Sequence, residues 1–411
     1  MSAVLAACER EQAWLLHFIR ELTAFESPST DFEPLAACGN WLAESLRSTG
    51  AQIERLPGQP TVDHVLAKWD GAGPHVLLIG HFDTVWPVGQ IHRMPIIERD
   101  GRLYGPGVLD MKAGLGIGVL AARVVGQLSD LQSRPHVTLL ATSDEEVGSG
   151  TSREAIEQLA RESDAVFVLE PALPGGAVKT ARKGVGEFQI VTTGISSHAG
   201  ANPGAGASAI HEMARQISAL EAMNDPSRGL SVNVGVVEGG TRSNVVAERA
   251  RALVDVRIQR ADDAVGIETA IRGLRPHDDR VRLEVIGGIN RPPMERTPGV
   301  AKLYALAREV AGSMGRVLDE GATGGASDGN FTAALGVPTI DGLGALGDGP
   351  HALHEHVVIN ELAPRAALVA GLMLRLSDND VSAAHSAAAR KRSGAMGPRE
   401  RPSRGSGQSP E

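Results

Sequence analysis

Carboxylates and imidazoles recur along this chain in patterns that suit metal ions. His81 and Asp83 stand two residues apart, directly after the apolar run 75–80. Residues two apart on an extended chain point the same way, so both side chains can face one site. A carboxylate beside a metal-bound histidine fixes the tautomer of the ring. The H-x-D spacing is a weak motif by itself, but it makes His81 a candidate ligand.

Acidic side chains follow two more apolar runs. Three adjacent carboxylates occupy 144–146 after the run 137–142, and Glu170 follows the run 165–169. Adjacent carboxylates repel one another unless water solvates them or a cation binds them. A solvated acidic loop is the plain alternative, and for Glu170 the signal is weak.

Asp110 and a group of histidines complete the candidates. Asp110 precedes a small-residue run at 112–128, where capping the helix would be its ordinary role. His351, His354 and His356 follow a glycine-rich loop far downstream. The spacing alone does not decide among these histidines.

Strands alternating with helices must position these groups. We expect strands at 75–80, 137–142 and 165–169, with helices at 112–128 and 152–161. This order predicts an α/β fold with a mostly parallel central sheet covered on both faces. In such sheets, ligands gather at the carboxyl ends of the strands. Two metal ions there need several ligands, a bridging carboxylate and a free base, and the candidates supply them.

The pattern changes near residue 183. A β-α-β-β-α-β order predicts an inserted ferredoxin-like (α+β) unit, with elements at 186–193, 207–223, 231–238, 251–259, 263–274 and 281–286. We therefore predict a catalytic domain at 1–182 and 292–378 and a hinged lid at 183–291. The tail 379–411 has almost no large apolar residue, which predicts disorder.

Composition narrows the partners. The formal charge is −9, and basic residues outnumber acidic ones in the tail, so the folded part is more acidic still. This argues against nucleic acid as a partner. The two cysteines, Cys8 and Cys38, fit buried free thiols. The N-terminus does not resemble a signal peptide and no apolar run is long enough to span a membrane, so we expect a cytoplasmic protein without a membrane partner.

Five co-linear segments resemble those of the zinc aminoacylase and glutamate carboxypeptidase family. They are G-H-F-D-T-V-W-P, Y-G-P-G-V-L-D-M-K-A-G, T-S-D-E-E-V-G-S, L-E-P-A and S-S-H-A-G. Acetylornithine deacetylase and succinyl-diaminopimelate desuccinylase are members of this family. The resemblance covers roughly residues 10–375. It implies a di-zinc exopeptidase-type catalytic domain with an inserted lid and dimerisation domain.

The resemblance implies two Zn²⁺ ions per subunit, for which Co²⁺ or Mn²⁺ could substitute because mostly carboxylate ligands are not strongly selective. It makes His81 and Glu170 ligands of one ion, Glu146 and His351 ligands of the other, and Asp110 the bridge. The family places a histidine four residues before a glutamate in the last segment. That spacing selects His351 over its rival, His354.

The resemblance also implies catalytic roles. Asp83 stands behind His81, and Glu145 is the general base that takes a proton from the metal-bridging water and passes it to the leaving nitrogen. The Asp110–Met111 bond resembles one that the family holds in cis.

On the lid, the histidine that matches His198 reaches the active site of the partner subunit and stabilises the oxyanion, which implies a homodimer. Asn244 and Arg291 align with residues that bind the substrate carboxylate.

The leading hypothesis is a metallocarboxypeptidase or amidase. It would release a glutamate-like C-terminal amino acid from an N-acyl or peptidyl substrate. A biosynthetic deacylase, of the acetylornithine deacetylase or aminoacylase type, is the second hypothesis. A catalytically inactive metal-binding scaffold is the third, although the presence of Glu145 argues against it.

Overall fold

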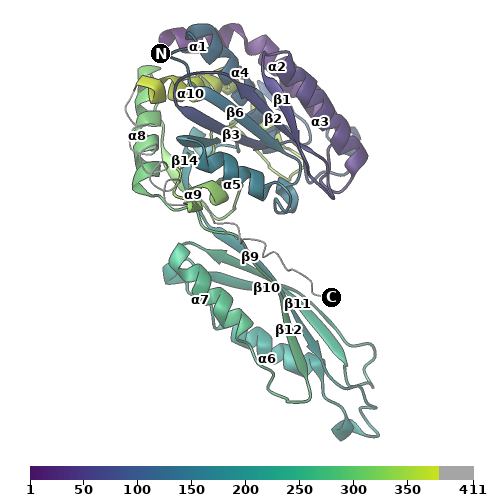
Figure 1. Cartoon of the computed structure of the whole chain (residues 1–411). Helices are drawn as coiled ribbons and strands as arrows, with labels where there is room; N and C mark the ends of the chain where they lie inside the picture. The colour runs from purple at the N-terminus through teal and green to yellow at the C-terminus, as the bar shows by residue number, and fades with distance from the viewer. Residues whose placement is uncertain (379–411) are drawn as a thin grey trace, which may run out of the picture.

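The computed structural model describes residues 1–378, which form two bodies, each with its own sheet. The larger body holds a six-stranded sheet, and the smaller one holds a four-stranded sheet (Figure 1). Strands β9 and β12 of the smaller sheet lead to and from the larger body (Figure 1). The predicted disordered tail lies outside the described residues.

The central sheet has the strand order β1-β2-β6-β3-β7-β14. Its strands are β1 (Gln52–Leu56), β2 (His64–Trp69), β3 (His75–His81), β6 (His136–Thr142), β7 (Ala165–Val168) and β14 (Thr339–Ile340). The strands β6, β3, β7 and β14 are parallel, whereas β1 and β2 form an antiparallel edge. The prediction of an α/β fold with a mostly parallel sheet is confirmed, but the antiparallel edge was not predicted.

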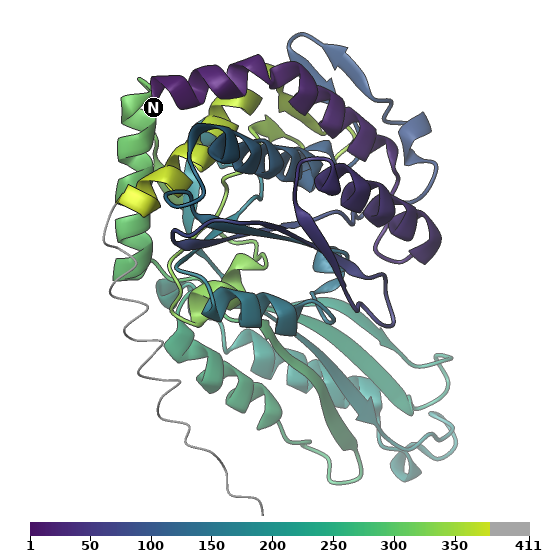
Figure 2. The same cartoon turned by 45° about the horizontal axis from the view of Figure 1, so that its top comes forward.

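Helices cover both faces of this sheet. One face packs against helices from both ends of the chain: α1 (Ser2–Arg10), α2 (Gln12–Ala24), α3 (Phe32–Arg47), α4 (Ala113–Leu128), α8 (Pro298–Ser313) and α10 (Ile359–Asp378). The other face packs against α5 (Arg153–Arg161) and α9 (Gly329–Ala334). In β3, Val76 and Leu78 enter the first core while Leu77 and Ile79 enter the second. This explains the continuous apolar run of β3. Figure 2 shows the N-terminal helices lying over the sheet.

Helix α4 lies unusually close to the segment that follows β7. A Cβ atom on Gly114 would lie 1.9 Å from the carbonyl oxygen of Leu169. Only glycine permits this approach, because any side chain would displace the backbone. The small residues of α4 thus set the position of the segment that carries Glu170.

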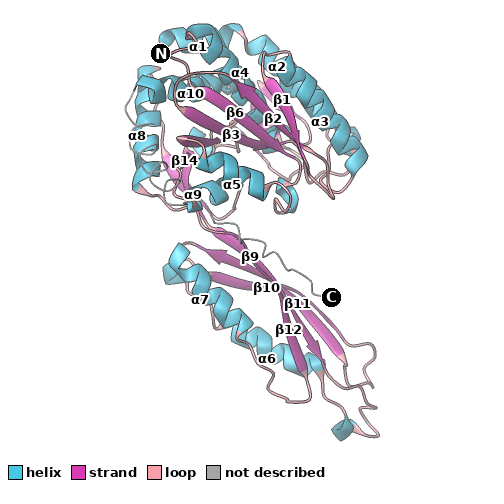
Figure 3. Ribbon diagram, viewed as in Figure 1, coloured by secondary structure: helices cyan, strands magenta, loops and turns pink. Residues whose placement is uncertain are grey.

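The smaller body has the predicted ferredoxin-like order. Its elements are β9 (Gly184–Thr193), α6 (Ala209–Glu221), β10 (Ser231–Gly239), β11 (Arg249–Ile258), α7 (Ala261–Arg272) and β12 (Arg282–Arg291). The sheet order is β10-β11-β9-β12, and all pairs are antiparallel. Both helices lie along one side of the sheet (Figure 3), and a separate apolar cluster fills the space between them.

Several short strands were not predicted. They are β4 (Ile97–Arg99), β5 (Arg102–Tyr104), β8 (Val178–Arg182), β13 (Glu320–Thr323), β15 (Gly347–Asp348) and β16 (His356–Val358). Strands this short lack a measurable period, so only their partners define them. Strand β16 pairs with β5 and so holds the histidine-rich loop near Asp110.

Two simpler expectations can also be compared with the structure. Cys8 and Cys38 are free and buried, as predicted. Within residues 1–378, none of the helices combines the length and the apolar character needed to cross a membrane.

Candidate metal centre

The carboxyl ends of three parallel strands meet at one edge of the central sheet and carry the first candidate ligands. His81 is the last residue of β3. Glu145 and Glu146 begin a single 3₁₀ turn (Glu145–Val147) just after β6. Glu170 follows β7 by two residues. The parallel register brings these strand ends together, which explains why residues so far apart in the sequence share one site.

Asp110 lies between two histidines. It belongs to a wide turn (Val108–Lys112) and has extended backbone angles, φ −113° and ψ 93°, just before α4. Its Oδ1 lies 3.3 Å from His81 Nε2, and its Oδ2 lies 3.5 Å from His351 Nε2. The Asp110 side chain therefore faces two imidazoles instead of capping the helix. The Asp110–Met111 peptide bond is cis, as the resemblance implied.

The other candidate ligands complete two groups around Asp110. Glu170 Oε1 lies 3.7 Å from His81 Nε2, and Glu146 Oε1 lies 3.4 Å from His351 Nε2. The structure thus brings all the proposed ligands together. The rival histidine, His354, is exposed and forms no ion pair with these groups in the described part of the chain.

Asp83 lies behind His81, as predicted, and it contacts both the His81 ring and the backbone of the turn at Glu145 and Glu146. Its Oδ1 is 3.4 Å from His81 Nδ1, and its backbone carbonyl oxygen is 3.0 Å from the same nitrogen. The carboxylate also accepts hydrogen bonds from the backbone N–H groups of Glu145 (3.3 Å) and Glu146 (3.2 Å). Ser29 Oγ donates to it at 2.7 Å. One carboxylate therefore orients both the histidine and the acidic turn.

Glu355 has a role that the sequence did not reveal. Its buried carboxylate accepts hydrogen bonds from Trp86 Nε1 (2.9 Å) and from the backbone N–H groups of Gly107 (2.9 Å), Leu109 (2.8 Å) and Asp110 (3.1 Å). The sequence indicated Glu355 only as the glutamate four residues after His351. In the structure it holds the turn that presents Asp110.

Nearby carboxylates raise the pKa of both candidate histidine ligands. The Asp110 and Glu146 carboxylates, 3.5 and 3.4 Å from His351 Nε2, raise the pKa of His351 to about 10. Burial would lower the pKa of His81, but the adjacent Asp110 and Asp83 carboxylates outweigh this effect, so the pKa of His81 lies well above the ordinary value. Without metal, protons on the imidazoles supply the positive charge that these carboxylates need.

The pKa values of two carboxyls are also raised. Burial raises the pKa of Glu145 well above the ordinary value, although the positive charge of Arg291 opposes it. Burial and the charge of Asp110 raise the pKa of Glu170 to about 7. Clustered buried carboxyls with raised pKa values are typical of functional sites.

These residues fit divalent cations. Two overlapping sets have ligand atoms within 4.8 Å of one another: His81 with Asp110 and Glu146, and His81 with Glu145 and Glu170. His81 Nε2 and Glu146 Oε1 are buried, and neither has a hydrogen-bond partner within residues 1–378. Buried polar atoms normally have partners, so these two atoms point to a ligand at this place. Imidazole and carboxylate together suit zinc and similar metals.

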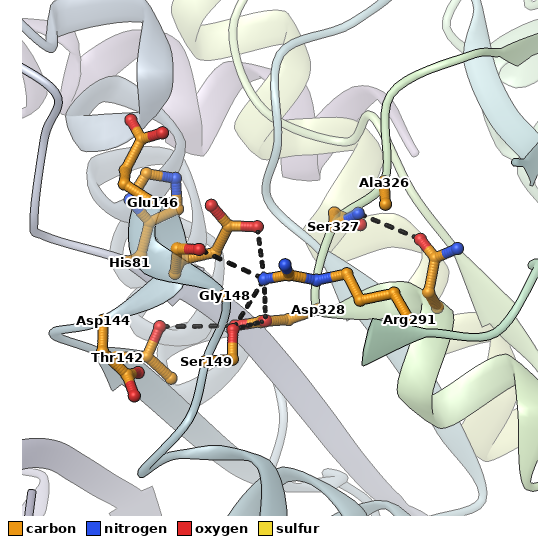
Figure 4. A network of polar contacts seen from close by, with 12 residues as sticks. His81, Thr142, Asp144, Glu146, Gly148, Ser149, Arg291, Ala326, Ser327 and Asp328 are labelled. Atoms are coloured by element: carbon orange, nitrogen blue, oxygen red, sulfur yellow. Dashed lines mark hydrogen bonds and ion pairs between the residues drawn. The ribbon is translucent and has the colours of Figure 1, made fainter. Parts of the chain in front are cut away.

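Arg291 lies at the junction between the two bodies, at the end of β12. It crosses to Ser149 and Asp328 (Figure 4), with its Nη2 2.7 Å from Ser149 Oγ and 3.2 Å from Asp328 Oδ1. The same nitrogen lies 3.0 Å from Glu145 Oε1. Arg291, predicted to bind a substrate carboxylate, is therefore already paired with carboxylates of the protein. Its Nε is buried and has no partner in the described chain, which leaves one donor for a ligand.

Sequence reasoning missed a second buried arginine. Arg182 Nη2 lies 3.6 Å from Glu170 Oε2, and the guanidinium binds both oxygens of Asp341 at 2.6 and 2.9 Å. This bidentate pair holds a positive charge beside Glu170. Asp341 is 159 residues from Arg182 in the sequence, so no local pattern could have indicated the pair.

The glycine-rich loop before α9, residues 324–328, supports Arg291. The backbone N–H of Ser327 donates to Asn330 Oδ1 (2.9 Å). Asp328 is buried, and its carboxylate holds Arg291 and Ser149. The loop therefore supports the centre from within.

The two remaining predicted residues, His198 and Asn244, lie on the exposed surface of the smaller body. They are neighbours, because Ala199 N, next to His198, donates to the Asn244 carbonyl oxygen at 2.9 Å. His198 Nδ1 accepts hydrogen bonds from the backbone N–H groups of Gly200 (3.1 Å) and Ala201 (3.0 Å). The neutral ring therefore carries its proton on Nε2, which finds no acceptor within residues 1–378. The described chain does not bring either residue to the metal centre.

Comparison with known proteins supports this picture. Carboxypeptidase G2 of Pseudomonas sp. (strain RS-16) is 28% identical over 389 residues, which cover 91% of this chain and 92% of that protein. Succinyl-diaminopimelate desuccinylase of Gluconacetobacter diazotrophicus is 30% identical over 365 residues, covering 82% of this chain and 90% of that protein. The chain therefore spans nearly the full length of both relatives.

A solved structure shares the fold. The YXEP protein of Bacillus subtilis, a dinuclear metal binding peptidase from the M20 family, superposes with a TM-score of 0.66 at 17% identity. The match covers 90% of this chain and 99% of that protein. Residues 77–375 match the sequence profile of peptidase family M20/M25/M40. The chain therefore belongs to peptidase family M20/M25/M40 and is a metal-dependent hydrolase of amide or peptide bonds.

Proposed function

We propose that the protein is a di-zinc carboxypeptidase or amidase that releases a glutamate-like C-terminal amino acid from an N-acyl or peptidyl substrate. One observation carries the two-metal proposal: the two oxygens of Asp110 face two different imidazoles, at 3.3 and 3.5 Å. A carboxylate in that position can bridge two ions. When bound, the ions would acidify a water molecule and polarise the scissile carbonyl.

In this proposal, His81 and Glu170 hold one ion, Glu146 and His351 hold the other, and Asp110 bridges them. Co²⁺ or Mn²⁺ could take the place of Zn²⁺. The dinuclear centre of the B. subtilis relative supports the same reading.

Glu145 acts as the general base. It differs from its neighbour Glu146 because it already has a cationic partner, Arg291 at 3.0 Å. It would take a proton from water and pass that proton to the leaving nitrogen. Its raised pKa suits a group that must both accept and return a proton near neutral pH. Asp83 orients the turn from which Glu145 reaches the centre.

We further propose that residues 1–182 and 292–378 form the catalytic domain, and that 183–291 form a lid through which two copies associate. His198 and Asn244, exposed side by side on the lid, would then serve the partner's centre, while Arg291 binds the substrate carboxylate.

A complementation experiment tests the shared active site. A mixture of His198→Ala and Glu145→Gln subunits should regain activity, since mixed dimers contain one intact site, whereas either variant alone stays inactive. No recovery on mixing would refute the shared site.

Elemental analysis tests the metal proposal. The wild type should bind two zinc ions per chain, and Asp110→Ala should lose both, because two dications without a bridging anion repel one another strongly. Two zinc ions retained by Asp110→Ala would contradict the assignment. Glu145→Gln should keep its metal and lose turnover, which separates the base from the ligands.

A substrate panel tests the reaction. The carboxypeptidase G2 relative supports release of a C-terminal amino acid, for which we would test N-acylglutamates and folate-like compounds. The succinyl-diaminopimelate desuccinylase relative makes N-succinyl-diaminopimelate a substrate to test and supports the biosynthetic deacylase as a second candidate. We expect glutamate release from N-acylglutamates to be the fastest of these reactions, with N-acetylornithine included as a third substrate. Failure of the zinc-loaded protein to hydrolyse any of them would refute the proposal.

A further inference from the structure

We propose that Asn330 is a positioning residue for the reaction: it clamps both chain crossings between the two bodies and thereby sets Arg291 beside the metal centre. The crossings are residues 182–184, which join β8 to β9, and residues 291–294, which begin at the end of β12 (Figure 1). The inference rests on the proposed function, in which Arg291 binds the carboxylate of the substrate. It adds a residue that controls substrate binding without touching the substrate.

The side-chain amide of Asn330 bonds both crossings at once. Asn330 lies in α9 of the larger body and is completely buried. Its Nδ2 donates to the carbonyl oxygen of Lys183 at 3.1 Å and to the carbonyl oxygen of Pro292 at 2.7 Å. Its Oδ1 accepts a hydrogen bond from the backbone N–H of Ser327 at 2.9 Å. Both N–H donors of the amide are therefore used on the crossings, while its oxygen is anchored in the larger body.

The two crossings also lie directly against each other. The backbone N–H groups of Arg182 and Met294 donate to each other's carbonyl oxygens, at 2.9 and 3.0 Å. A Cβ atom on Gly184 would lie 2.7 Å from the carbonyl oxygen of Arg291 and 2.7 Å from the backbone nitrogen of Pro293. The crossings therefore pack as a pair, and the bonds of Asn330 hold them together against the larger body.

The clamp acts on Arg291 because Pro292 is the next residue in the chain. Arg291 Nη2 lies 3.0 Å from Glu145 Oε1, and Arg291 Nε is buried without a partner within residues 1–378. A guanidinium binds a carboxylate strongly only when its N–H groups have the right distance and direction. A positioning group displaced by about 1 Å can cost about 100-fold in rate. Release of the clamp should therefore weaken the binding of a substrate carboxylate by Arg291.

Asn330→Asp tests the clamp, because it keeps the shape of the side chain and the acceptor for Ser327. Its second oxygen would face the carbonyl oxygens of Lys183 and Pro292, so both donors are lost. We expect KM for an N-acylglutamate to rise about 10- to 100-fold, the usual cost of losing a hydrogen bond to a charged group, with a smaller change in kcat. Zinc content should stay at the wild-type value, since no hydrogen bond of Asn330 involves a proposed ligand. A wild-type KM would overturn the inference.

A double-mutant cycle shows whether the effect passes through Arg291. In an Arg291→Gln background, Asn330→Asp should raise KM by no more than about twofold, because the group that Asn330 positions is already gone. The same rise in KM in both backgrounds would overturn the positioning role.

Gly184→Ala perturbs the same junction from the other crossing. Its new Cβ would meet the backbone at Arg291, so the crossings must move apart. We expect the same rise in KM, with the same dependence on Arg291. This second variant keeps the test valid if the buried charge of Asn330→Asp prevents folding, and a wild-type KM in Gly184→Ala would contradict the inference.

Thr332→Val is the matched control for a loss of stability alone. Thr332 is also buried in α9, but its hydroxyl bonds the Gly329 carbonyl oxygen (3.0 Å) and Thr339 Oγ1 (2.8 Å), both within the larger body. This variant should unfold at a lower urea concentration and keep the wild-type KM. A KM raised as much as in Asn330→Asp would show that general destabilisation, and not the clamp, causes the effect.

Hydrogen exchange separates the clamp from the proposed function. In Asn330→Asp and Gly184→Ala, the backbone amides of Arg182 and Met294 should exchange about tenfold faster or more, whereas Thr332→Val should leave their exchange rates unchanged. If no N-acylglutamate were hydrolysed, the proposed function would fail, and the exchange rates would still decide whether Asn330 holds the crossings. Wild-type exchange at both amides in both variants would refute the clamp.

Discussion

Replacement of Glu355 by Gln tests how the bridging carboxylate is held. Each Glu355 oxygen accepts two N–H groups: Oε2 binds Trp86 and Gly107, and Oε1 binds Leu109 and Asp110. A glutamine offers one oxygen, and its NH₂ group would face two donors. Losing two hydrogen bonds to a charged acceptor at about 1.5–3 kcal/mol each predicts a destabilisation of about 3–6 kcal/mol.

The same change should weaken metal binding, because the turn that loses its anchor carries Asp110. Loss of a group that orients a metal ligand typically lowers affinity about 10- to 100-fold. Zinc affinity by chelator competition and unfolding by calorimetry would measure the two effects. Glu54→Gln is the control: its exposed ion pair with Lys68, at 3.0 Å, contributes at most about 1 kcal/mol. A Glu355→Gln protein with wild-type stability and zinc affinity would refute the reasoning.

Three further predictions concern pH and packing. The pKa of His351 is raised from 6.5 to about 10, so the protonated ring stabilises the metal-free protein fully below pH 6.5, and this stabilisation is lost as the pH rises through 10. Because zinc must displace this proton, the affinity for zinc should increase with pH by up to about tenfold per pH unit between 6.5 and 10. Chelator competition from pH 6.5 to 9 measures this, and a flat profile would contradict it. Arg291→Gln should raise the pKa of Glu145, because the positive charge of Arg291 lowers this pKa in the wild type. Since the base must be deprotonated to act, the acid limb of the kcat/KM profile should move to higher pH. An acid limb at the wild-type pH would count against Glu145 as the base. Gly114→Ala should destabilise the protein by about 1–3 kcal/mol in urea unfolding, because the new Cβ would lie 1.9 Å from the Leu169 carbonyl oxygen. The control Gly312→Ala meets no atom within 4 Å and should be neutral or slightly stabilising, and equal effects of the two changes would refute the packing argument.

The amino-acid sequence by itself was sufficient for the framework. The continuous apolar run of β3 predicted a strand buried on both faces, and the structure places its alternate residues in two different cores. The order of the elements in the smaller body predicted its ferredoxin-like topology. Both features depend on local periodicity and on the order of segments, which a sequence displays directly.

Short strands could not be predicted from local periodicity. Strand β14 has two residues, and β8 gains its identity only from its pairing with β13. The antiparallel edge formed by β1 and β2 was missed for a related reason. Their pairing depends on which neighbour each strand finds, and no property of the segments themselves reveals that neighbour.

Within the site, the sequence supplied the ligand types and the tertiary structure decided which of them meet. The local sequence favoured a helix cap for Asp110, whereas the fold places it between His81 and His351. The preference for His351 over His354 rested on a family resemblance. In the described residues it is His351, and not His354, that faces Asp110.

The supporting groups were determined by tertiary structure alone. Glu355 and the Asp110 backbone are 245 residues apart, and Arg182 meets Asp341 across 159 residues. Hydrogen bonds and ion pairs of this kind act over a few ångströms, so they exist only after the chain has brought distant segments together. Local sequence can therefore indicate which groups a site contains, but the partners that orient them depend on the fold.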